Sequence, residues 1–315
     1  MENVLMEVKH LKKYFKAKQG TLHAVDDVSF QVLKGETLGL VGESGCGKST
    51  TGRAILRLHE PTAGEVIYNG EDIVKYSKSQ MKEMRKKMQI VFQDPYSSLN
   101  PRLSVYDLIA DPLYVNKDVV PKNQIGEQVK RTMKLVGLEK RLINSFPHEL
   151  DGGRRQRVGI ARALALNPEF IVLDEPVSAL DVSIQSQILN LLDELQEELG
   201  LTYIFVAHNL SVVKHISDRI AVMYLGNIVE LTDYKSIFTD PLHPYTQALL
   251  SAIPIPKVGL KRERIVLEGD VPSPIDPGPG CVFYGRCRHR KGICKEAKPK
   301  FEEKKPGHYV ACHLI

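Results

Sequence analysis

The order of apolar and polar positions along the chain predicts an α/β fold. Apolar runs of strand length occupy residues 36–41, 89–95, 170–176 and 202–208. The run FIVLDEP at 170–176 is apolar almost without a break, which is typical of a parallel strand covered on both faces. Apolar residues then recur at helical spacing between Asp181, a good N-cap, and Gly200, which favours a helix end.

Another part of the pattern predicts a small antiparallel layer. Apolar residues at strand spacing occupy residues 4–9, 22–33 and 65–68. Asn69-Gly70 follows the last of these runs and is a strong turn signal. A second turn at Gly226-Asn227 predicts a hairpin nearer the C-terminus.

The middle of the chain predicts a mostly helical insert. Residues 103–145 carry helical patterns and no strand signal, and we expect Pro112 and Pro121 to break the helices there. A last helix is expected over residues 243–252.

The C-terminal part differs in composition from the rest. Residues 254–279 are rich in Pro and Gly, which indicates a linker. Residues 281–315 hold nine Lys or Arg and three Glu, a net charge of +6, whereas the rest of the chain sums to −1. Four of the five Cys also lie there. We predict a main domain at 1–253, with a helical subdomain at about 94–160, and a linker with a Cys-containing extension at 254–315.

Membrane insertion is not expected. No apolar run approaches the roughly 18–20 residues that span a bilayer. The N-terminal residues MENVLMEVKH carry charge and lack the apolar centre of a signal peptide. We expect a water-soluble, cytoplasmic chain that meets a membrane only through a partner.

The stretch GESGCGKST at residues 42–50 matches the phosphate-loop pattern G-x-x-x-x-G-K-[ST]. Its glycines let backbone N–H groups approach phosphate oxygens, and a helix starting near Lys48 would point its positive end at the same anion. Lys48 would reach the β- and γ-phosphates, and the Ser49 hydroxyl would be a Mg²⁺ ligand. Cys46 is interpreted as a small filler, with a redox switch as the alternative. The residues expected to contact ATP are Gly42, Ser44, Gly45, Cys46, Gly47, Lys48, Ser49 and Thr50. A glycine-rich turn that binds nothing is the other interpretation of the loop.

The order of the later motifs resembles the ATPase subunit of ABC transporters. After the phosphate loop come a strand with Gln93 at its end, the helical insert, a Gly-Gly helix start, FIVLDEP, and a strand followed by His208. The resemblance covers residues 4 to about 240. It implies a P-loop NTPase with a RecA-like, mostly parallel sheet, an antiparallel β layer and a helical insert.

The resemblance implies roles at the magnesium site. Asp174 would hold Mg²⁺ together with Ser49 and Gln93. Glu175 resembles the general base that polarises the attacking water, and a second carboxylate that only tunes the metal site is the alternative. Gln93 resembles the residue that also contacts this water.

Two further roles follow from the same resemblance. His208 resembles the switch histidine that bonds the γ-phosphate, although a lone His at a strand end is usually structural. Tyr14 resembles the aromatic residue that stacks on adenine, and Tyr14-Phe15 as part of the core is the alternative.

The chain departs from the family at its signature sequence. Where the family has L-S-G-G-Q, this chain has LDGGR, so that Asp151 replaces Ser and Arg154 replaces Gln. Gly152 and Gly153 remain, and with Asp151 they are expected to face a partner's ATP. Asp151 either weakens that site, because an ionised carboxylate cannot donate a hydrogen bond to phosphate, or caps the signature helix. Both can hold at once.

Three stretches resemble the oligopeptide/dipeptide importer ATPases, and the F-type subunit in particular: QDPYSSLNPR (93–102), HPYTQALL (243–250) and GDVPSPIDPGPGC (269–281). This implies an ATP-hydrolysing subunit at the cytoplasmic face of the membrane. The implied partners are a second ATPase subunit, two permease subunits and an extracytoplasmic peptide-binding protein. The alternative is a soluble ABC-type ATPase acting on nucleic acid or ribosomes. No nucleic acid is expected, because the basic tail lacks interleaved aromatic residues.

The four tail cysteines have the spacing C-x5-C-x6-C-x17-C. This spacing lacks the C-x2-C pairs of common zinc ribbons. Four thiolates can hold a [4Fe–4S] cluster or Zn²⁺, and the basic tail would offset a cluster's negative charge. Some members of the resembling family carry such a cluster, so we predict one on Cys281, Cys287, Cys294 and Cys312. Zinc and free thiols are the alternatives. We expect the tail to lie outside the ATP site.

Overall fold

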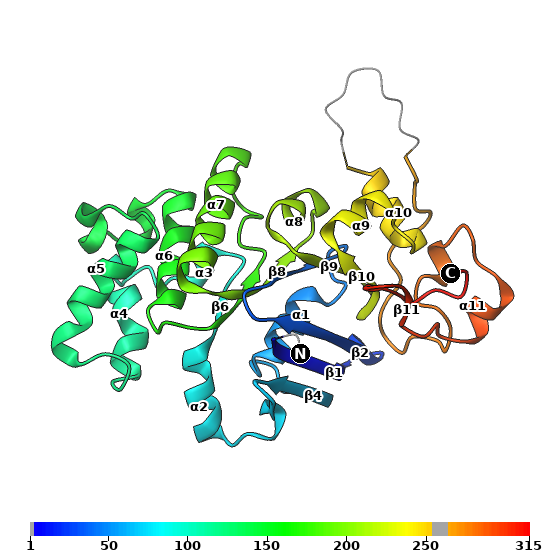
Figure 1. Ribbon diagram of the computed structural model, residues 1–315, viewed down its shortest axis with the longest axis horizontal. Coiled ribbons are helices and arrows are strands. Elements are labelled where there is room, and N and C mark those ends of the chain that lie inside the picture. The colour runs from blue at the N-terminus through cyan, green and yellow to red at the C-terminus, as the bar shows by residue number, and fades with distance from the viewer. Residues whose placement is uncertain (1–2, 254–263) are drawn as a thin grey trace. The chain divides into compact units, whose positions relative to one another are not determined.

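The computed structural model describes residues 3–253 and 264–315 (Figure 1). Within these residues the chain divides into two compact units. The first comprises residues 3–33, 37–75, 206–253 and 264–315, and the second comprises residues 34–36 and 76–205. Part of the predicted linker, residues 254–263, lies outside the described residues.

An antiparallel sheet opens the first unit. Strands β1 (Val4–Ala17) and β2 (Gly20–Leu33) form a long hairpin in which Val8 faces Phe30 and Tyr14 faces His23. The strand order is β2-β1-β4-β5, with β4 at Ala63–Tyr68 and β5 at Glu71–Asp72. The predicted antiparallel layer is therefore confirmed, and β1 and β2 extend beyond their predicted ends.

The second set of strands in this unit has the order β11-β12-β10-β9-β3. The fully buried β3 runs parallel to β9, and the other neighbours are antiparallel. Their bounds are Thr37–Val41 (β3), Arg219–Tyr224 (β9), Asn227–Asp233 (β10), Glu302–Lys305 (β11) and His308–Val310 (β12). The tail thus adds strands that the sequence did not predict. The exposed residues EEKK of β11 have no apolar pattern, and the strand forms because β12 pairs with β10.

The sequence predicted two helices of the first unit, one starting near Lys48 and a last one over residues 243–252, and the structure adds three more among the described residues. Tyr234 to Thr239 form a helix that Asp233 caps, and Pro244 to Ser251 form the expected last helix. The bounds are Lys48–Ile55 (α1), Leu210–Ile216 (α8), Tyr234–Thr239 (α9), Pro244–Ser251 (α10) and Gly292–Glu296 (α11).

The second unit holds strands in the order β8-β7-β6 and most of the helices (Figure 1). Strand β7 is buried throughout and runs parallel to β6. Helix α7 begins after the N-cap Asp181 and ends at Gly200, whose left-handed φ of 65° suits glycine, as predicted. The bounds are Lys78–Lys87 (α2), Met88–Val91 (β6), Pro95–Ser98 (α3), Val105–Val115 (α4), Ile125–Leu135 (α5), Gly152–Leu164 (α6), Phe170–Asp174 (β7), Val182–Leu199 (α7) and Thr202–Ala207 (β8).

Helices α4, α5 and α6 pack on one another and form the predicted helical insert. The expected break at Pro112 is wrong, because α4 continues through this residue to Val115. Pro112 has no N–H to donate to the carbonyl of Leu108, and α4 ends three residues after it. The Asn116 N–H and side-chain amide both donate to the Pro112 carbonyl, at 3.1 and 2.8 Å, and so complete the last turn. The break at Pro121 is confirmed, since a new 3-10 turn starts at Lys122.

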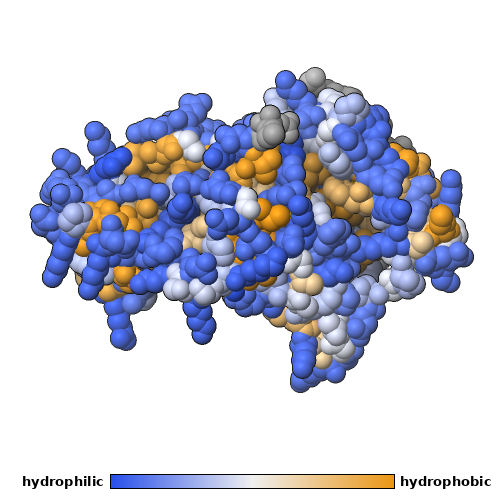
Figure 2. All heavy atoms as spheres, turned by 60° about the horizontal axis from the view of Figure 1, so that its bottom comes forward, coloured by the Kyte–Doolittle hydropathy of each residue, from blue (hydrophilic) through white to orange (hydrophobic). Residues whose placement is uncertain are grey.

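Helices suited to a membrane are absent from the described residues. None of the helices in residues 3–253 and 264–315 is long and apolar enough to cross a bilayer. On the face seen in Figure 2, hydrophilic side chains surround scattered hydrophobic patches.

Candidate nucleotide site

The phosphate loop connects β3 to α1 in the first unit. Gly42 and Gly47 have φ angles of 156° and 103°, which favour glycine. A Cβ atom on Gly42 would lie 2.1 Å from the Met223 carbonyl oxygen, and one on Gly47 would lie 2.0 Å from that of Ala24. The loop therefore requires glycine for both its backbone conformation and its close packing.

Lys48 is the first residue of α1, and its side chain packs back against the phosphate loop. Its side chain is buried, and Nζ donates to the carbonyl oxygens of Gly42 at 2.9 Å and Glu43 at 3.0 Å. These bonds hold the ammonium group beside the backbone that would surround phosphate. Ser49 and Thr50 follow in the first helical turn, half-buried, whereas Ser44 and Gly45 are exposed at the loop tip.

Cys46 fits its interpretation as a filler. Its side chain is 2% exposed, and burial raises the pKa of the thiol. A buried thiol with a raised pKa is a poor nucleophile and reacts slowly with oxidants. The Cys46 backbone carbonyl accepts from the Gly226 N–H at 2.8 Å, which fastens the loop to the β9–β10 turn.

Tyr14 has partners of its own in the first unit. Its ring stacks on His23 with centroids 4.0 Å apart, and its hydroxyl donates to Asp26 Oδ1 at 2.5 Å. Burial and then the bond to Asp26 raise the pKa of Tyr14, so the hydroxyl stays a donor. Lys298 from the tail binds the other oxygen of Asp26 at 2.9 Å.

In the second unit, the predicted catalytic residues Gln93 and Glu175 lie together. Asp174 ends β7 and is fully buried, and Glu175 follows with a left-handed φ of 49°. This turn directs the Glu175 side chain to Gln93, whose Nε2 donates to Glu175 Oε2 at 2.8 Å. Gln93 lies two residues beyond the end of β6, rather than at its last residue as predicted. The bond orients a carboxylate that could polarise a water molecule.

His208 is exposed in the first unit, directly after β8. The next residue, Asn209, caps α8 by accepting from the Ser211 N–H at 2.8 Å. His208 therefore lies at the carboxyl end of a strand, where open α/β sheets place their ligands.

The signature residues begin α6 in the second unit. Asp151 is the N-cap, and its Oδ1 accepts from the Arg154 N–H at 2.7 Å. The Arg154 guanidinium also lies 3.4 Å from Asp151 Oδ2 and 3.2 Å from Glu139 Oε1. Gly152 and Gly153 form the first turn. The capping interpretation of Asp151 thus has a geometric basis, and Arg154 offsets part of its charge.

The four tail cysteines lie in one small module of the first unit. Cys287 and Cys294 are buried, whereas Cys281 and Cys312 are half-buried. Burial, with the other three thiols adding to it, raises the pKa of Cys281 to about 11, and burial also raises the pKa of Cys287 and Cys312. Within the described residues, no three or more Cys, His, Asp or Glu side chains are arranged to hold a metal ion. Thiolates are the donors that zinc and iron–sulfur clusters take, but here the four sulfur atoms are not arranged around a metal ion.

The expectation that the tail lies outside the nucleotide site is wrong for Arg286. This side chain binds Glu43 of the phosphate loop at 2.6 and 3.2 Å, and Tyr245 of the HPY segment accepts a hydrogen bond from the Glu43 N–H at 2.9 Å. Sequence reasoning missed all three residues. Glu43 stands at a variable position of the phosphate-loop pattern, so the pattern gives it no role. Arg286 differs from the other basic residues of the tail only in that it comes directly before Cys287 in the sequence.

The phosphate loop, the buried lysine on it and the carboxylate pair after an apolar strand define a P-loop nucleoside triphosphatase. The family model described as ABC transporter matches residues 25–178, and that described as Oligopeptide/dipeptide transporter, C-terminal region, matches residues 229–294. The chain therefore belongs to the ATP-binding proteins of ABC transporters, and within them to the oligopeptide/dipeptide group.

Individual relatives agree with this placement. The chain is 52% identical to the oligopeptide transport ATP-binding protein AppF of Bacillus subtilis (strain 168), over 99% of this chain and 98% of AppF. It is 51% identical to OppF of Haemophilus influenzae, over 99% and 97% of the two chains. The solved dimer of the ATP-binding cassette MJ0796 bound to ADP and Pi has a TM-score of 0.67 and 31% identity, over 73% of this chain and 98% of that one.

Proposed function

We propose that this chain is the ATP-hydrolysing subunit that powers peptide import through membrane permease partners. The observation that carries the proposal is the buried Lys48 on a complete phosphate loop, in a chain of the oligopeptide/dipeptide transporter group. A P-loop provides little covalent chemistry, so catalysis consists of positioning and of neutralising charge on the γ-phosphoryl group.

Each unit supplies part of the reaction. In the first, the loop N–H groups and Lys48 would bind the β- and γ-phosphates, Tyr14 would stack on adenine, and His208 would bond the γ-phosphate. In the second, Glu175, oriented by Gln93, would accept the proton of the attacking water. Ser49, Asp174 and Gln93 would hold Mg²⁺, which supplies charge neutralisation when bound.

We infer a second ATPase subunit as partner. The related MJ0796 cassette forms a dimer with ADP and Pi, and in this chain Asp151, Gly152 and Gly153 would face the ATP of the partner. Two permease subunits and an extracytoplasmic peptide-binding protein would complete the importer, with this chain at the cytoplasmic face. The relatives named above are oligopeptide transport proteins, which gives no support to the alternative function on nucleic acid.

We also propose a [4Fe–4S] cluster on Cys281, Cys287, Cys294 and Cys312. The support is a set of four thiols in one basic module that influence one another electrostatically. A tetrahedral Zn²⁺ site would need sulfur atoms about 3.8 Å apart, from Zn–S bonds of ~2.3 Å. Zinc on the same four thiolates is the alternative.

The function is tested by Glu175→Gln in the chain assembled with its partner ATPase and permease. MgATP should still bind, because the phosphate loop is unchanged. Hydrolysis should fall by about 10²–10⁴-fold, since a neutral amide cannot act as a general base. Glu197→Gln, an exposed glutamate on α7, is the matched control and should hydrolyse ATP as the unmodified chain does.

Hydrolysis by Glu175→Gln within a few-fold of the unmodified complex would show that another residue is the base. An unmodified complex that hydrolyses no ATP in the presence of peptide would contradict the proposed function itself.

A further inference from the structure

Glu43 of the phosphate loop is bound by side chains that come from residues beyond 240. Its backbone N–H donates to the Tyr245 hydroxyl at 2.9 Å. Its carboxylate accepts two hydrogen bonds from Arg286, one to each oxygen, at 2.6 and 3.2 Å. Its backbone carbonyl accepts from Lys48 Nζ at 3.0 Å. The residue next to Gly42 is thus fixed through its backbone and its side chain at once.

Tyr245 is held in place by the rest of the HPY segment. His243 caps α10, and its Nδ1 accepts from the Tyr245 N–H at 3.1 Å. The His243 ring is fully buried, and this burial lowers its pKa to about 4, so Nδ1 remains an acceptor at neutral pH. Tyr245 is itself fully buried, which leaves its hydroxyl little freedom to move away from Glu43.

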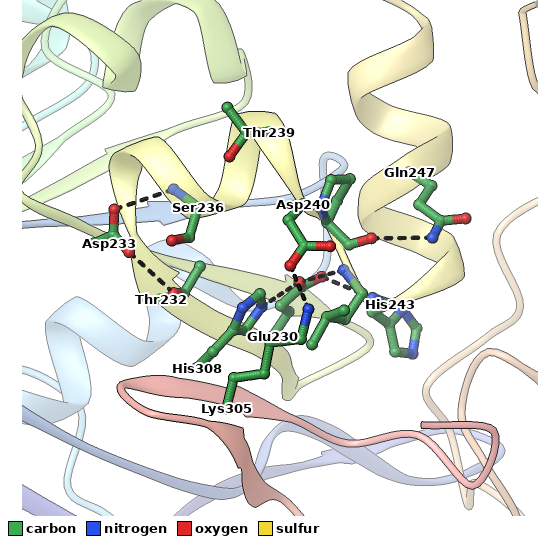
Figure 3. A network of polar contacts seen from close by, with 12 residues as sticks. Glu230, Thr232, Asp233, Ser236, Thr239, Asp240, His243, Gln247, Lys305 and His308 are labelled. Carbon is green, nitrogen blue, oxygen red and sulfur yellow. Dashed lines mark hydrogen bonds and ion pairs between the residues drawn. The ribbon is translucent and has the colours of Figure 1, made fainter.

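The HPY segment is in turn fixed by Glu230 of β10 (Figure 3). The fully buried Glu230 carboxylate accepts from the N–H groups of Leu242 and His243 at 2.7 and 3.0 Å. It also bonds to Nε2 of His308 on β12, at 2.7 Å. One carboxylate therefore joins the HPY segment to the terminal hairpin of the tail.

Arg286 is similarly confined. It precedes Cys287 in the cysteine module, and its side chain is 9% exposed. Phe283 packs against Tyr224 and Tyr245, with ring centroids 5.2 and 5.4 Å away, and so fixes the turn that carries Arg286. A bidentate pair between guanidinium and carboxylate is among the strongest and most directional contacts available to side chains.

We propose that Tyr245 and Arg286 are positioning residues for nucleotide binding, which fix Glu43 in the phosphate loop and neutralise its carboxylate. This inference rests on the proposed function, because it assumes that the phosphate loop binds a nucleotide. It gives the HPY segment a physical role and makes nucleotide affinity depend on the folded cysteine module.

The charges of Glu43 and Arg286 predict how single and double substitutions should differ in nucleotide affinity. With Arg286 removed, the Glu43 carboxylate would stand uncompensated in a loop that must accept a polyphosphate. Removing both charges leaves no such repulsion. Arg286→Gln should therefore weaken nucleotide binding more than Glu43→Gln/Arg286→Gln does. A contact that merely stabilised the fold would change the unfolding free energy of these variants and leave the nucleotide affinity of the folded chain unchanged.

The test is calorimetric titration of MgADP into the full chain, with the unfolding free energy measured without nucleotide. Arg286→Gln should bind about tenfold more weakly, the factor that corresponds to ~1.4 kcal/mol. The double variant Glu43→Gln/Arg286→Gln should recover most of that loss. Tyr245→Phe, which removes only the hydroxyl acceptor, should bind a few-fold more weakly. Arg290→Gln, an exposed arginine of the same module, is the matched control and should bind as the unmodified chain does.

Equal MgADP affinity for the unmodified chain, Tyr245→Phe and a folded Arg286→Gln would overturn the proposal, as would a double variant that binds no better than Arg286→Gln. If Arg286→Gln does not fold, Tyr245→Phe decides by itself. An unmodified chain that binds no MgADP would instead overturn the proposed function, and the inference with it.

Discussion

Asp151 shows how one residue can carry two effects. It caps α6 through the Arg154 N–H, a role that serine in the family signature can also fill. It also brings a negative charge to a position that would face a triphosphate across a dimer. At ~4 Å and an effective dielectric of ~20, a pair of like unit charges costs about 4 kcal/mol before compensation. Arg154, bound to Asp151 and Glu139, supplies part of that compensation.

Substitutions of Asp151 can separate its effect on stability from its effect on ATP hydrolysis. Asp151→Ala should lower the unfolding free energy by about 1 kcal/mol, whereas Asp151→Ser should change it little, because serine is also a good N-cap. Asp151→Ser/Arg154→Gln should raise ATP hydrolysis by the chain alone, since it restores a hydroxyl donor and removes the charge. Denaturant titration and a steady-state ATPase assay measure the two effects. If the unmodified chain already hydrolyses ATP cooperatively by itself and the reversion changes nothing, Asp151 is only a cap.

At the scale of elements, α10 depends on a histidine that must stay neutral. Burial lowers the pKa of His243 to about 4, although Glu230 acts in the opposite direction. In the unfolded chain the same ring titrates near its ordinary value of 6.5. Below that pH the unfolded state binds a proton that the folded state does not. The stability that His243 contributes is therefore complete above pH 6.5 and is lost as the pH falls toward 4.

This linkage predicts an acid-sensitive fold. Between pH 6.5 and pH 5, His243 should cost the chain about 1.6 kcal/mol of unfolding free energy, since the full slope of ~1.36 kcal/mol per pH unit is reached only below the unfolded pKa. His243→Asn keeps an N-cap but has no titrating ring, so its stability should fall less over the same interval. Chemical denaturation of both chains at several pH values measures the difference. Parallel pH profiles for the two chains would count against a neutral buried His243.

At the scale of the whole molecule, the tail is part of the first unit rather than an appendage. Strand β12 pairs with β10, and Arg286 binds Glu43. Lys298 binds Asp26, which also accepts the hydrogen bond from the Tyr14 hydroxyl. The tail has few apolar residues, so a metal cluster would supply folding free energy that its core cannot. The raised pKa values of Cys281, Cys287 and Cys312 mean that such a cluster would displace protons from these thiols when it binds.

Chain purified without oxygen should be brown, absorb broadly in the visible region and contain iron. Cys294→Ser should lose the colour and the iron, because it removes a ligand. Cys46→Ser is the matched control and should keep both, since Cys46 lies in the phosphate loop. Metal analysis and absorption spectra of the three proteins provide the measurement. Colourless protein with one zinc per chain, or with no metal, would contradict the cluster.

The local features that sequence reasoning recovered are those set by short-range physics. The loop at 42–50, the buried strand before Asp174 and the helix between Asp181 and Gly200 each follow from residues adjacent in the chain. Backbone freedom at glycine, apolar periodicity and helix capping are local properties, so these elements can be predicted without knowledge of the tertiary packing. The continuation of α4 through Pro112 was missed because it depends on the packing of α4 against α5 and α6 and on the Asn116 bonds that complete the last turn.

The sequence by itself determined the class of the protein, its phosphate loop and the buried strand that ends at Asp174. Only the tertiary structure decided how the C-terminal residues take part. Tyr245 and Arg286 lie about 200 and 240 residues beyond Glu43 in the chain, and nothing near them in sequence marks the contact. Such contacts depend on β12 pairing with β10 and on the burial of Glu230, His243 and Phe283. These are long-range events whose free energy comes from packing and desolvation, and no local pattern of residues records them.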